Sequence, residues 1–524
     1  MRFLLCGKKK NRFFDPILYL FTFVFGSCRF CRCGIFDNNI DKRRGKYRIK
    51  KEHMNKIKIP IELQKMNSVF EKNGFESYLA GGAVRDMILG KRASDWDVAT
   101  NATPAQVSSI FKKVIPTGES HGTVTVFFMR HKIEVTTYRV DGKYSDGRHP
   151  DNVSFAASIE EDLSRRDFTM NAIAASLKDG SLKDPFSGQD DIKQKIIKTV
   201  GSPKDRFLED GLRPVRALRF LSQLDFSIEQ KTYEAIFDKS VQEKIKQISI
   251  ERFKDEFEKI LLSKKPSSAL FAMEKTGILK LFIPELAECR GVSQKDCRGF
   301  HDFDVLDHCV WACDGARQNN LTVRCASLFH DIGKKDTRSI EKKQVSSGSE
   351  NQTIEVVHFY SHEIRSSQIT KQILVRLRFS NAFIEKVCHL VANHMFHYEP
   401  SWTDSAVRRF IVKVKPENIE DLFEVRLADI YATHKIPFDV NSESAKNLDE
   451  LSERIKKILE KQNALCLKDL AVNGNDLLAL GIPKGKKIGI ILNELFQTVL
   501  DDPAMNEKEK LLSVAKKLYE KYYG

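Results

Sequence analysis

The stretch from Leu79 to Thr100, LAGGAVRDMILGKRASDWDVAT, limits the possible folds of this chain more than any other. It predicts a short strand that runs into Gly81 and Gly82, a helix over AVRDMILG, and a second strand over DWDVAT. Residues two apart in a strand face the same side, so Asp95 and Asp97 present two carboxylates to one point. The stretch therefore predicts an α/β domain in which a glycine turn and a helix N-terminus lie near two carboxylates.

The same stretch carries residue types suited to a nucleoside triphosphate and a metal ion. Paired carboxylates hold Mg²⁺, which prefers a few carboxylates together with substrate phosphates. Gly82 lets the backbone approach a triphosphate, the helix offers N–H groups, and Arg85 supplies a bidentate cation. A lone Asp-x-Asp pattern is more often a solvated turn, but here GGAVRD precedes it. The stretch thus favours metal-assisted nucleotidyl transfer, in which a hydroxyl attacks and pyrophosphate leaves.

Outside this stretch, the hydrophobic pattern predicts strands early in the chain and helices later. TPAQVSSIFKK predicts a helix with Thr103 as its cap, and GTVTVFFM and KIEVTTYRV alternate as strands do. From Ile159 onward the periodicity is helical, as in ERFKDEFEKILL. The polar segment KKQVSSGSENQT, residues 342–353, is interpreted as a loop. The predicted fold class is multidomain, α/β with a mixed sheet followed by all-α.

Two further clusters are candidates for holding the nucleotide itself. Arg166, in SRRDFTMNAIA, can hold phosphates or ribose. Asp210 and Arg213 are three apart and would project from one face of a helix, with Arg216 and Arg219 extending the row. A fixed acceptor beside a fixed donor matches the amino group and bare ring nitrogen of cytosine and adenine, and it leaves uracil and guanine unpaired. The alternative is an ordinary salt bridge along the helix.

As a set, these motifs resemble one known family. GGAVRD, the aspartate pair, RRDFTMNAIA, DPFSGQDDI and EDGLRPVRALRF occur in the order seen in class II CCA-adding tRNA nucleotidyltransferases and bacterial poly(A) polymerases. The resemblance implies a polymerase-beta-like nucleotidyltransferase head followed by a helical neck, with Mg²⁺ as the cofactor and tRNA, CTP and ATP as partners. It also implies the roles of the residues: metal binding by Asp95 and Asp97, triphosphate binding by Gly82 and Arg85, nucleotide binding by Arg166, and base reading by Asp210 and Arg213 with Arg216 and Arg219 nearby.

Three details of the resemblance affect the expected chemistry. Glu134 is a candidate third acidic group. Residues 144–155, YSDGRHPDNVSF, resemble the flexible loop that the family associates with the switch from C to A addition, which favours full CCA addition. Pro214 stands where many relatives have an aliphatic residue, and it fits only if the helix begins nearby.

A second resemblance concerns residues 300–440, which contain LDHCVW, LFHDIGKKD, FYSHEIRSS, VANHM and RLADIYA. These motifs resemble the pattern of HD-domain phosphohydrolases. The resemblance implies a site for an unidentified divalent metal ion and hydrolysis of 2′,3′-cyclic phosphates, 2′-nucleotides or simple phosphates. Any one histidine is more often a satisfied core residue, but six residues in family order favour metal binding: His308, His330, Asp331, His362, His394 and Asp429.

Composition and the N-terminal segment complete the sequence-based expectations. The net charge of +15 indicates a polyanionic partner such as nucleic acid, although a solvated basic surface gives the same value. The eleven cysteines show no framework spacing, which is typical of a reduced, cytoplasmic protein. Residues 1–53 read as an untranslated upstream segment or, alternatively, a targeting peptide, and no membrane association is expected.

The expected organisation is a series of five segments. They are an extension at 1–54, a nucleotidyltransferase head at 55–200, a helical neck that binds nucleotide and RNA at 201–299, an HD-type domain at 300–440, and a helical tRNA-binding tail at 441–524. The leading function is CCA addition with an attached phosphohydrolase. The alternatives are a poly(A) polymerase, or an HD nucleotide phosphohydrolase with a degenerate head. The sequence leaves the oligomeric state open.

Overall fold

The computed structural model describes residues 56–93, 95–118, 122–141, 153–295, 303–347, 350–434, 442–461 and 465–523. The expected N-terminal extension and most of the 144–155 loop lie outside these residues. The described chain divides into two compact units. The larger unit comprises Ile49–Val391 with Ala428–Lys435, and the C-terminal unit comprises Ala392–Leu427 with Ile436–Gly524.

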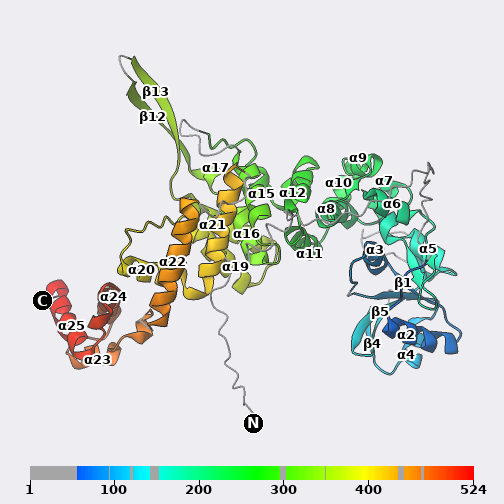
Figure 1. The fold of residues 1–524 in the computed structure, drawn as a ribbon, viewed down its shortest axis with the longest axis horizontal. Coiled ribbons are helices and arrows are strands. Elements are labelled where there is room, and N and C mark those ends of the chain that lie inside the picture. Colours follow the sequence, from blue (N-terminus) through cyan, green and yellow to red (C-terminus); the bar gives the residue numbers. More distant parts are fainter. Residues whose placement is uncertain are drawn as a thin grey trace, which may run out of the picture. The chain divides into compact units, whose positions relative to one another are not determined.

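The larger unit begins with a mixed sheet. Within the described residues it has seven strands in the order β3-β4-β5-β2-β1-β8-β9, and β2 and β5 are parallel while the other neighbours are antiparallel (Figure 1). The strands are β1 (Ser77–Ala80), β2 (Asp97–Thr100), β3 (Val114–Gly118), β4 (Thr123–Phe128), β5 (His131–Thr137), β8 (Ala174–Ser176) and β9 (Leu182–Lys183). The helices of this region are α2 (Ile61–Lys72), α3 (Gly82–Ile88), α4 (Pro104–Ile110), α5 (Ile159–Ser164) and α6 (Gly188–Gln194).

The local predictions for this region are confirmed, with one exception. The strand–helix–strand order of the Leu79–Thr100 stretch is β1, α3 and β2. Thr103 caps α4 through a capping box with Gln106, and Pro104 is the first helical residue. The expectation of helix alone after Ile159 is wrong, because β8 and β9 add to the sheet beside β1. β8 has three residues and β9 has two, so neither is long enough to show the alternation of apolar and polar residues by which a strand is recognised in a sequence.

After the sheet region, the neck consists of short helices that follow one another along the chain. Its elements are α7 (Pro203–Glu209), α8 (Leu212–Leu224), α9 (Gln230–Ala235), α10 (Lys239–Lys246), α11 (Ile250–Leu261), α12 (Pro266–Lys275), α13 (Ile278–Phe282) and α14 (Pro284–Ala287), with the short strands β10 (Ile196–Ile197) and β11 (Ser227–Ile228). Asp210 and Gly211 separate α7 from α8. A Cβ on Gly211 would lie 2.4 Å from the Lys244 carbonyl oxygen, so only glycine fits this junction. Pro214 is the third residue of α8, which confirms that the helix begins nearby.

The rest of the larger unit is helical apart from one hairpin. The helices are α15 (Val305–Gly315), α16 (Leu321–Phe329), α17 (Lys334–Thr337) and α18 (His362–Arg376), with α19 (Asn381–Asn393) up to Val391 and α21 (Ile419–His434) from Ala428 onward; the remaining residues of α19 and α21 belong to the C-terminal unit. Between α17 and α18, β12 (Arg338–Ser347) pairs in register with β13 (Glu350–Phe359).

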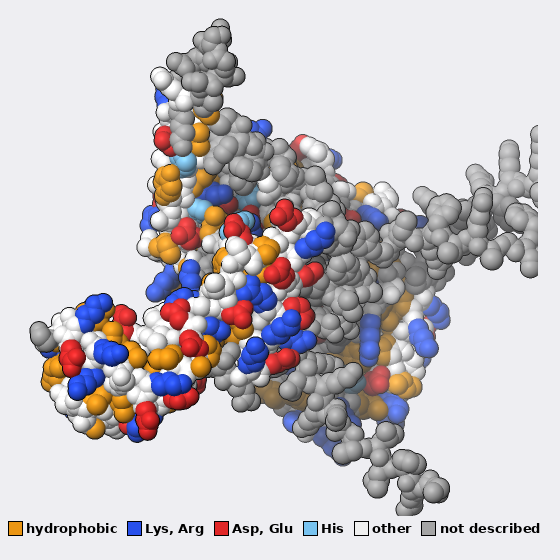
Figure 2. Space-filling model, turned by 60° about the vertical axis from the view of Figure 1, so that its left-hand side comes forward, with side chains coloured by type: hydrophobic (Ala, Val, Ile, Leu, Met, Phe, Trp, Pro, Cys, Tyr) orange, Lys and Arg blue, Asp and Glu red, His pale blue; other side chains and the backbone are white. Residues whose placement is uncertain are grey.

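This hairpin shows that the prediction of a loop at 342–353 is wrong. Figure 1 shows its two strands leading out from α17, and Figure 2 shows charged, polar and apolar side chains mixed on it at the top of the view. A ribbon that is largely exposed needs no alternation of apolar and polar residues. Its backbone hydrogen bonds, rather than a buried face, pair the strands.

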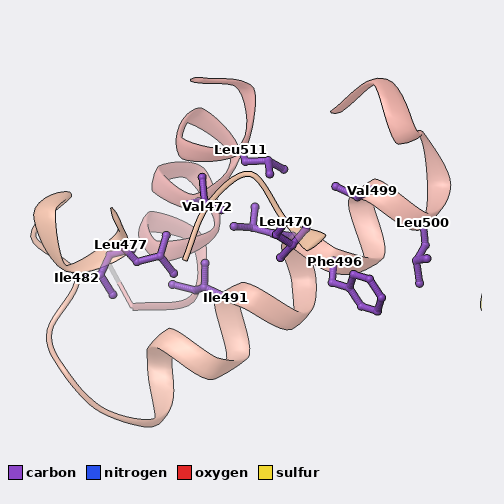
Figure 3. Packing of buried hydrophobic residues seen from close by; sticks show 11 residues of the cluster. Leu470, Val472, Leu477, Ile482, Ile491, Phe496, Val499, Leu500 and Leu511 are labelled. Carbon is purple, nitrogen blue, oxygen red and sulfur yellow. The ribbon is translucent and has the colours of Figure 1, made fainter. Parts of the chain in front are cut away.

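The C-terminal unit is a helical domain with its own core. It contains α20 (Asp404–Val414), α22 (Glu443–Glu460), α23 (Gly474–Ala479), α24 (Lys486–Asp501) and α25 (Lys508–Tyr523). Apolar side chains of α23, α24 and α25, among them Leu477, Ile491 and Leu511, pack together (Figure 3). This arrangement agrees with the predicted fold class of an α/β head and a helical body. Among the described helices, none combines the length and apolar character that a membrane crossing requires.

Candidate functional site

The two carboxylates of the opening motif lie at the start of β2. Asp97 is the first residue of the strand and Asp95 precedes it. Both are exposed, whereas Trp96 between them is buried. This alternation places the two carboxylates on the same side of the chain. In the parallel pairing of β2 with β5, Asp97 stands opposite Glu134, so a third carboxylate lies beside the first two.

Gly81 and Arg166 form the opposite wall of this acidic group. Gly81 has a φ of +76°, and a Cβ on it would lie 2.6 Å from Arg166 Nη1 and 4.0 Å from Asp97 Oδ2. Gly82 is the first residue of α3. Although the residue is exposed, the protein around its carboxylate removes part of the hydration and so raises the pKa of Asp97; Arg166 opposes the rise, and the carboxylates of Glu134 and Asp95 add to it. Carboxylates that repel one another in this way are stabilised by a cation placed among them, as Mg²⁺ would be.

Arg85 lies close to this group but is directed into the protein. Its guanidinium donates to Asn171 Oδ1 at 2.7 Å and to Asp86 Oδ1 at 2.8 and 3.0 Å, and it stacks over the Phe220 ring. Its side chain is buried. The structure therefore gives Arg85 three hydrogen bonds to protein side chains where the sequence predicted a ligand for the triphosphate.

Arg216 and Arg219 are likewise held by carboxylates. Arg216 donates to Asp167 Oδ2 at 2.7 and 2.8 Å, and Arg219 Nε lies 2.5 Å from Glu256 Oε2. Asp167 also accepts from Asn171 Nδ2 at 3.0 Å. These contacts join α8 and α11 to the 3₁₀ turn Thr169–Asn171 of the head.

The shared helix face expected for Asp210 and Arg213 is not observed, because the two residues do not belong to one helix. Asp210 lies in the junction before α8, where its carboxylate accepts from Arg252 at 2.7 and 3.1 Å. Arg213 pairs with Glu209 and donates to the Arg165 carbonyl oxygen at 3.1 Å. The break at Gly211 interrupts the helix, so the three-residue spacing no longer aligns the two side chains.

Arg252, Glu256 and Asn171 are contacts that the sequence reasoning missed. Arg252 and Glu256 belong to ERFKDEFEKILL, which was used only for its apolar face. Their spacing of four residues places both on one side of α11. Two charged residues on one side of an otherwise amphipathic helix were the feature of the sequence that indicated a contact with the charged helix α8.

A second group of titratable side chains lies elsewhere in the larger unit. His308 (α15), His330 and Asp331 (after α16) and Asp429 (α21) each offer a ligand atom, and these atoms all lie within 4.8 Å of one another. His308 Nε2 is 3.2 Å from His330 Nε2 and 3.1 Å from Asp429 Oδ1. His308, His330 and Asp331 are almost fully buried. Two imidazoles and two carboxylates form a donor set that suits a divalent transition metal ion.

Backbone carbonyls orient the imidazoles of this group. His330 Nδ1 lies 2.8 Å from the Ser327 oxygen, and His362 Nδ1 lies 2.7 Å from the Phe359 oxygen. Each contact directs Nε2 toward the carboxylates, as in metal sites whose ligands are held by a further shell of contacts. His362 Nε2 is 3.1 Å from Asp331 Oδ1. His394 is also buried, directly after α19, and belongs to the C-terminal unit.

The charge balance of this group favours a bound cation. Burial lowers the pKa of His330, but the carboxylates of Asp331 and Asp429 outweigh it and raise that pKa to about 10. Lys334 Nζ lies 2.6 Å from Asp331 Oδ2. Positive charge is therefore stabilised beside these buried carboxylates. The residues present fit a metal ion by donor type, by orientation and by charge.

Lys486 and Lys487 lie at the beginning of α24 in the segment expected to bind tRNA. Lys487 Nζ lies 4.1 Å from the centroid of the Tyr523 ring and 5.6 Å from that of Tyr519. The helices of the C-terminal unit expose Lys and Arg side chains mixed with Asp and Glu on the face seen at the left of Figure 2. This face is therefore mixed in charge.

Comparisons with known proteins extend these observations to most of the chain. The sequence matches the Poly A polymerase head domain family over residues 77–198, the family described as the probable RNA and SrmB-binding site of polymerase A over 225–290, and the putative tRNA nucleotidyltransferase domain 2 family over 349–515. It is 33% identical over 470 residues to the CCA-adding enzyme of Ligilactobacillus salivarius (strain UCC118), covering 88% of this chain and 98% of that protein.

Further relatives give the same result. The CCA-adding enzyme of Enterococcus faecalis (strain ATCC 700802 / V583) is 32% identical over 465 residues, covering 88% of this chain and 97% of that protein. The crystal structure of the Bacillus stearothermophilus CCA-adding enzyme in complex with CTP matches with 27% identity and a TM-score of 0.65, covering 88% of this chain and 98% of that one. The similarity therefore includes the head, the neck and the helical regions.

Proposed function

Because the chain belongs to the CCA-adding enzyme family, we propose that it adds C, C and A to the 3′ end of tRNA from CTP and ATP without a nucleic-acid template. The observation that carries this proposal is the group of Asp95, Asp97 and Glu134 beside Gly81 and Arg166. In the reaction the 3′-hydroxyl oxygen of the RNA bonds to the α-phosphorus of the nucleotide, the bond to pyrophosphate breaks, and the hydroxyl proton is released.

The proposed roles follow the geometry of the side chains. Asp95 and Asp97 hold Mg²⁺, which supplies charge neutralisation at the phosphates and activates the attacking hydroxyl. Gly82 lets the backbone approach the triphosphate, and Arg166 binds the nucleotide. Arg85 is already paired inside the protein, so we assign it to positioning Asn171 and α3 rather than to direct contact.

We further propose that base selection takes place at the α7–α8 junction. Asp210 and Arg213 supply an acceptor and a donor on the two sides of Gly211. To contact a base, Asp210 must give up its hydrogen bond from Arg252 and accept one from the base instead. Arg213 must likewise give up its contact with Glu209. Arg216 and Arg219 hold α8 in place through Asp167 and Glu256.

A second activity is supported by the buried histidines and aspartates. We propose that His308, His330, Asp331, His362 and Asp429 hold a divalent metal ion that activates water against a phosphate ester. His394 remains a predicted ligand from its place in the sequence pattern. Removal of a 2′,3′-cyclic phosphate from a damaged tRNA end would suit such a centre, since nucleotide addition needs a free hydroxyl.

The deciding experiment supplies each nucleotide separately. The full chain is incubated with Mg²⁺ and tRNA that lacks its 3′ CCA, together with CTP alone, ATP alone, or both. Addition of two C followed by a single A supports the proposal. Long A tails would identify a poly(A) polymerase instead, and no addition by a folded protein would leave the phosphohydrolase as the main activity.

Replacing both Asp95 and Asp97 with Ala separates the two sites. Both residues are exposed at the beginning of β2, so the variant is expected to fold. Nucleotide addition should be abolished, while hydrolysis of a cyclic phosphate should continue. Loss of both activities in a folded variant would show that the two sites depend on one another.

A further inference from the structure

The β12–β13 hairpin is inserted between two of the proposed metal ligands. Asp331 precedes β12 and His362 follows β13. The segment that leads into the hairpin and the last residue of β13 are both held close to the ligands: Gly333 N–H, before α17, donates to Ser366 Oγ at 2.9 Å, and the Phe359 carbonyl oxygen lies 2.7 Å from His362 Nδ1. A Cβ on Gly333 would lie 2.5 Å from the Ser366 backbone nitrogen. The base of the hairpin is therefore fixed against the ligand cluster.

Tyr360 lies at this base. It follows the last residue of β13 and comes two residues before His362, a distance of at most about 7 Å between Cα atoms. Its ring stacks on that of His358, with centroids 5.0 Å apart and planes at 10°. His358 is held by Glu341, since its Nε2 lies 3.1 Å from Glu341 Oε2.

The stacked pair leaves one aromatic surface open to solvent. Tyr360 is 69% exposed although one side of its ring is covered by the His358 imidazole. Nucleobases stack on exposed aromatic rings of this kind, whatever their sequence, because every base has a π-face.

We propose that Tyr360, supported by His358, is the stacking platform for a nucleobase, and that the metal centre takes ribonucleoside phosphate esters, in particular the 2′,3′-cyclic phosphate, rather than phosphate esters without a base. This inference rests on the proposed phosphohydrolase function. A ribose separates a base from its phosphate, and Tyr360 and His362 are only two residues apart, so one ribose suffices to span from a base on Tyr360 to a phosphate at His362. In the hydrolysis the water oxygen bonds to phosphorus, the bond from phosphorus to one ribose oxygen breaks, and that oxygen takes up a proton.

The test compares a substrate with a base and one without. The full chain, loaded with Mn²⁺, is assayed on adenosine 2′,3′-cyclic phosphate and on methyl riboside 2′,3′-cyclic phosphate. We expect kcat/KM of the wild type to be about tenfold higher for the adenosine compound. Tyr360→Ala should remove this preference through KM, whereas Tyr360→Phe, which keeps the ring, should retain it.

A second readout does not depend on turnover. Binding of adenosine 2′-monophosphate should weaken about tenfold in Tyr360→Ala and stay unchanged in Ile340→Ala, which removes an exposed side chain at an alternate position of the same hairpin. Equal hydrolysis of both substrates, unaffected by Tyr360→Ala, would overturn the stacking platform and leave the phosphohydrolase intact. Hydrolysis of neither substrate would overturn both.

Discussion

At the scale of single residues, the backbone conformation of Gly81 allows the proposed catalytic side chains of the head to lie close to it. Its φ of +76° lies in the left-handed region that favours glycine, and its missing side chain leaves room for Arg166 and Asp97. The glycine pair was visible in the sequence as a turn signal. Which side chains approach it depends on β2, which begins with Asp97, and on the segment after α5, which carries Arg166.

Gly81→Ala is expected to lower nucleotide addition between about tenfold and hundredfold. The new Cβ would displace the Arg166 guanidinium, and a displacement of about 1 Å at a reacting centre can cost about a hundredfold in rate. Because the contact is with the end of a flexible side chain, the loss of stability should stay near the cost of a positive φ, about 1 kcal/mol. Nucleotide incorporation and thermal unfolding measure the two effects.

Gly74→Ala is the matched control for this variant. Gly74 also has a positive φ, +79°, but nothing lies within 4 Å of its added Cβ. We expect a similar loss of stability and unchanged nucleotide addition. Equal nucleotide addition by the two variants would show that the reaction does not depend on the position of Arg166 beside Gly81.

At the scale of elements, Asp167 connects the head to the neck. It follows α5 and accepts from Arg216 of α8, from Asn171 and from the Phe168 N–H. Its burial alone would raise its pKa, but Arg216 and these hydrogen bonds hold that pKa well below its usual range. The ion pair therefore stabilises the folded state wherever the carboxylate is charged.

Asp167→Asn should destabilise the larger unit by about 3 kcal/mol at pH 7, because Arg216 is left without its closest carboxylate. The folded pKa lies below the unfolded value of about 3.9. The wild-type advantage is thus complete above that value and is lost as the pH falls below it toward the folded pKa. Calorimetric unfolding from pH 7 down to pH 3 should show a constant difference between the two proteins above about pH 4 and a difference that begins to shrink below it.

Asp179→Asn tests whether the destabilisation expected for Asp167→Asn is due to the burial of its ion pair. Asp179 also pairs with a cation, Lys56 at 2.8 Å, but both side chains are largely exposed. Exposed ion pairs contribute little, so we expect almost no change in the unfolding temperature. A loss equal to that of Asp167→Asn would contradict the assignment of Asp167 as a buried link.

Also at the element scale, the hairpin shows a limit of pattern reading. Its polar residues were interpreted as a loop, yet residues 338–347 and 350–359 pair along their whole length. The error matters for function, because Tyr360 and His358 lie at the hairpin base beside His362.

At the scale of the whole molecule, the larger unit contains both proposed sites. The carboxylates of the head come from two neighbouring strands, whereas the second group combines residues from α15, α21 and the turn after α16. A metal ion that binds only the folded state stabilises it by mass action, about 2.7 kcal/mol at a hundred times its dissociation constant.

Removing the metal should therefore lower the unfolding temperature of the larger unit. The full chain is treated with a chelator and then titrated with Mn²⁺, and calorimetry follows the transition. Wild-type protein should regain the higher temperature, and Asp331→Ala should not respond, because it loses a central ligand. Asp331→Ala should keep nucleotide addition within about twofold, since its site is separate from the head. An equal response of both proteins to Mn²⁺ would place the stabilising metal elsewhere.

The sequence by itself determined the local features of the protein. The strand–helix–strand order around Gly81, the cap of α4 and the placement of Asp95 and Asp97 on one side of the chain depend on contacts within a few residues, and such contacts follow from spacing. The order of the motifs also indicated the family, which the comparisons confirm.

Only the tertiary structure decided which partners the charged residues take. Arg85 pairs with Asn171, Asp210 with Arg252, and Arg213 with Glu209, although spacing alone suggested other contacts. Such choices depend on which elements pack together and on the break at Gly211, where the nearby Lys244 carbonyl leaves no room for a side chain. A buried charge must find a partner among whatever the fold brings near it, and that set is not visible in one stretch of sequence.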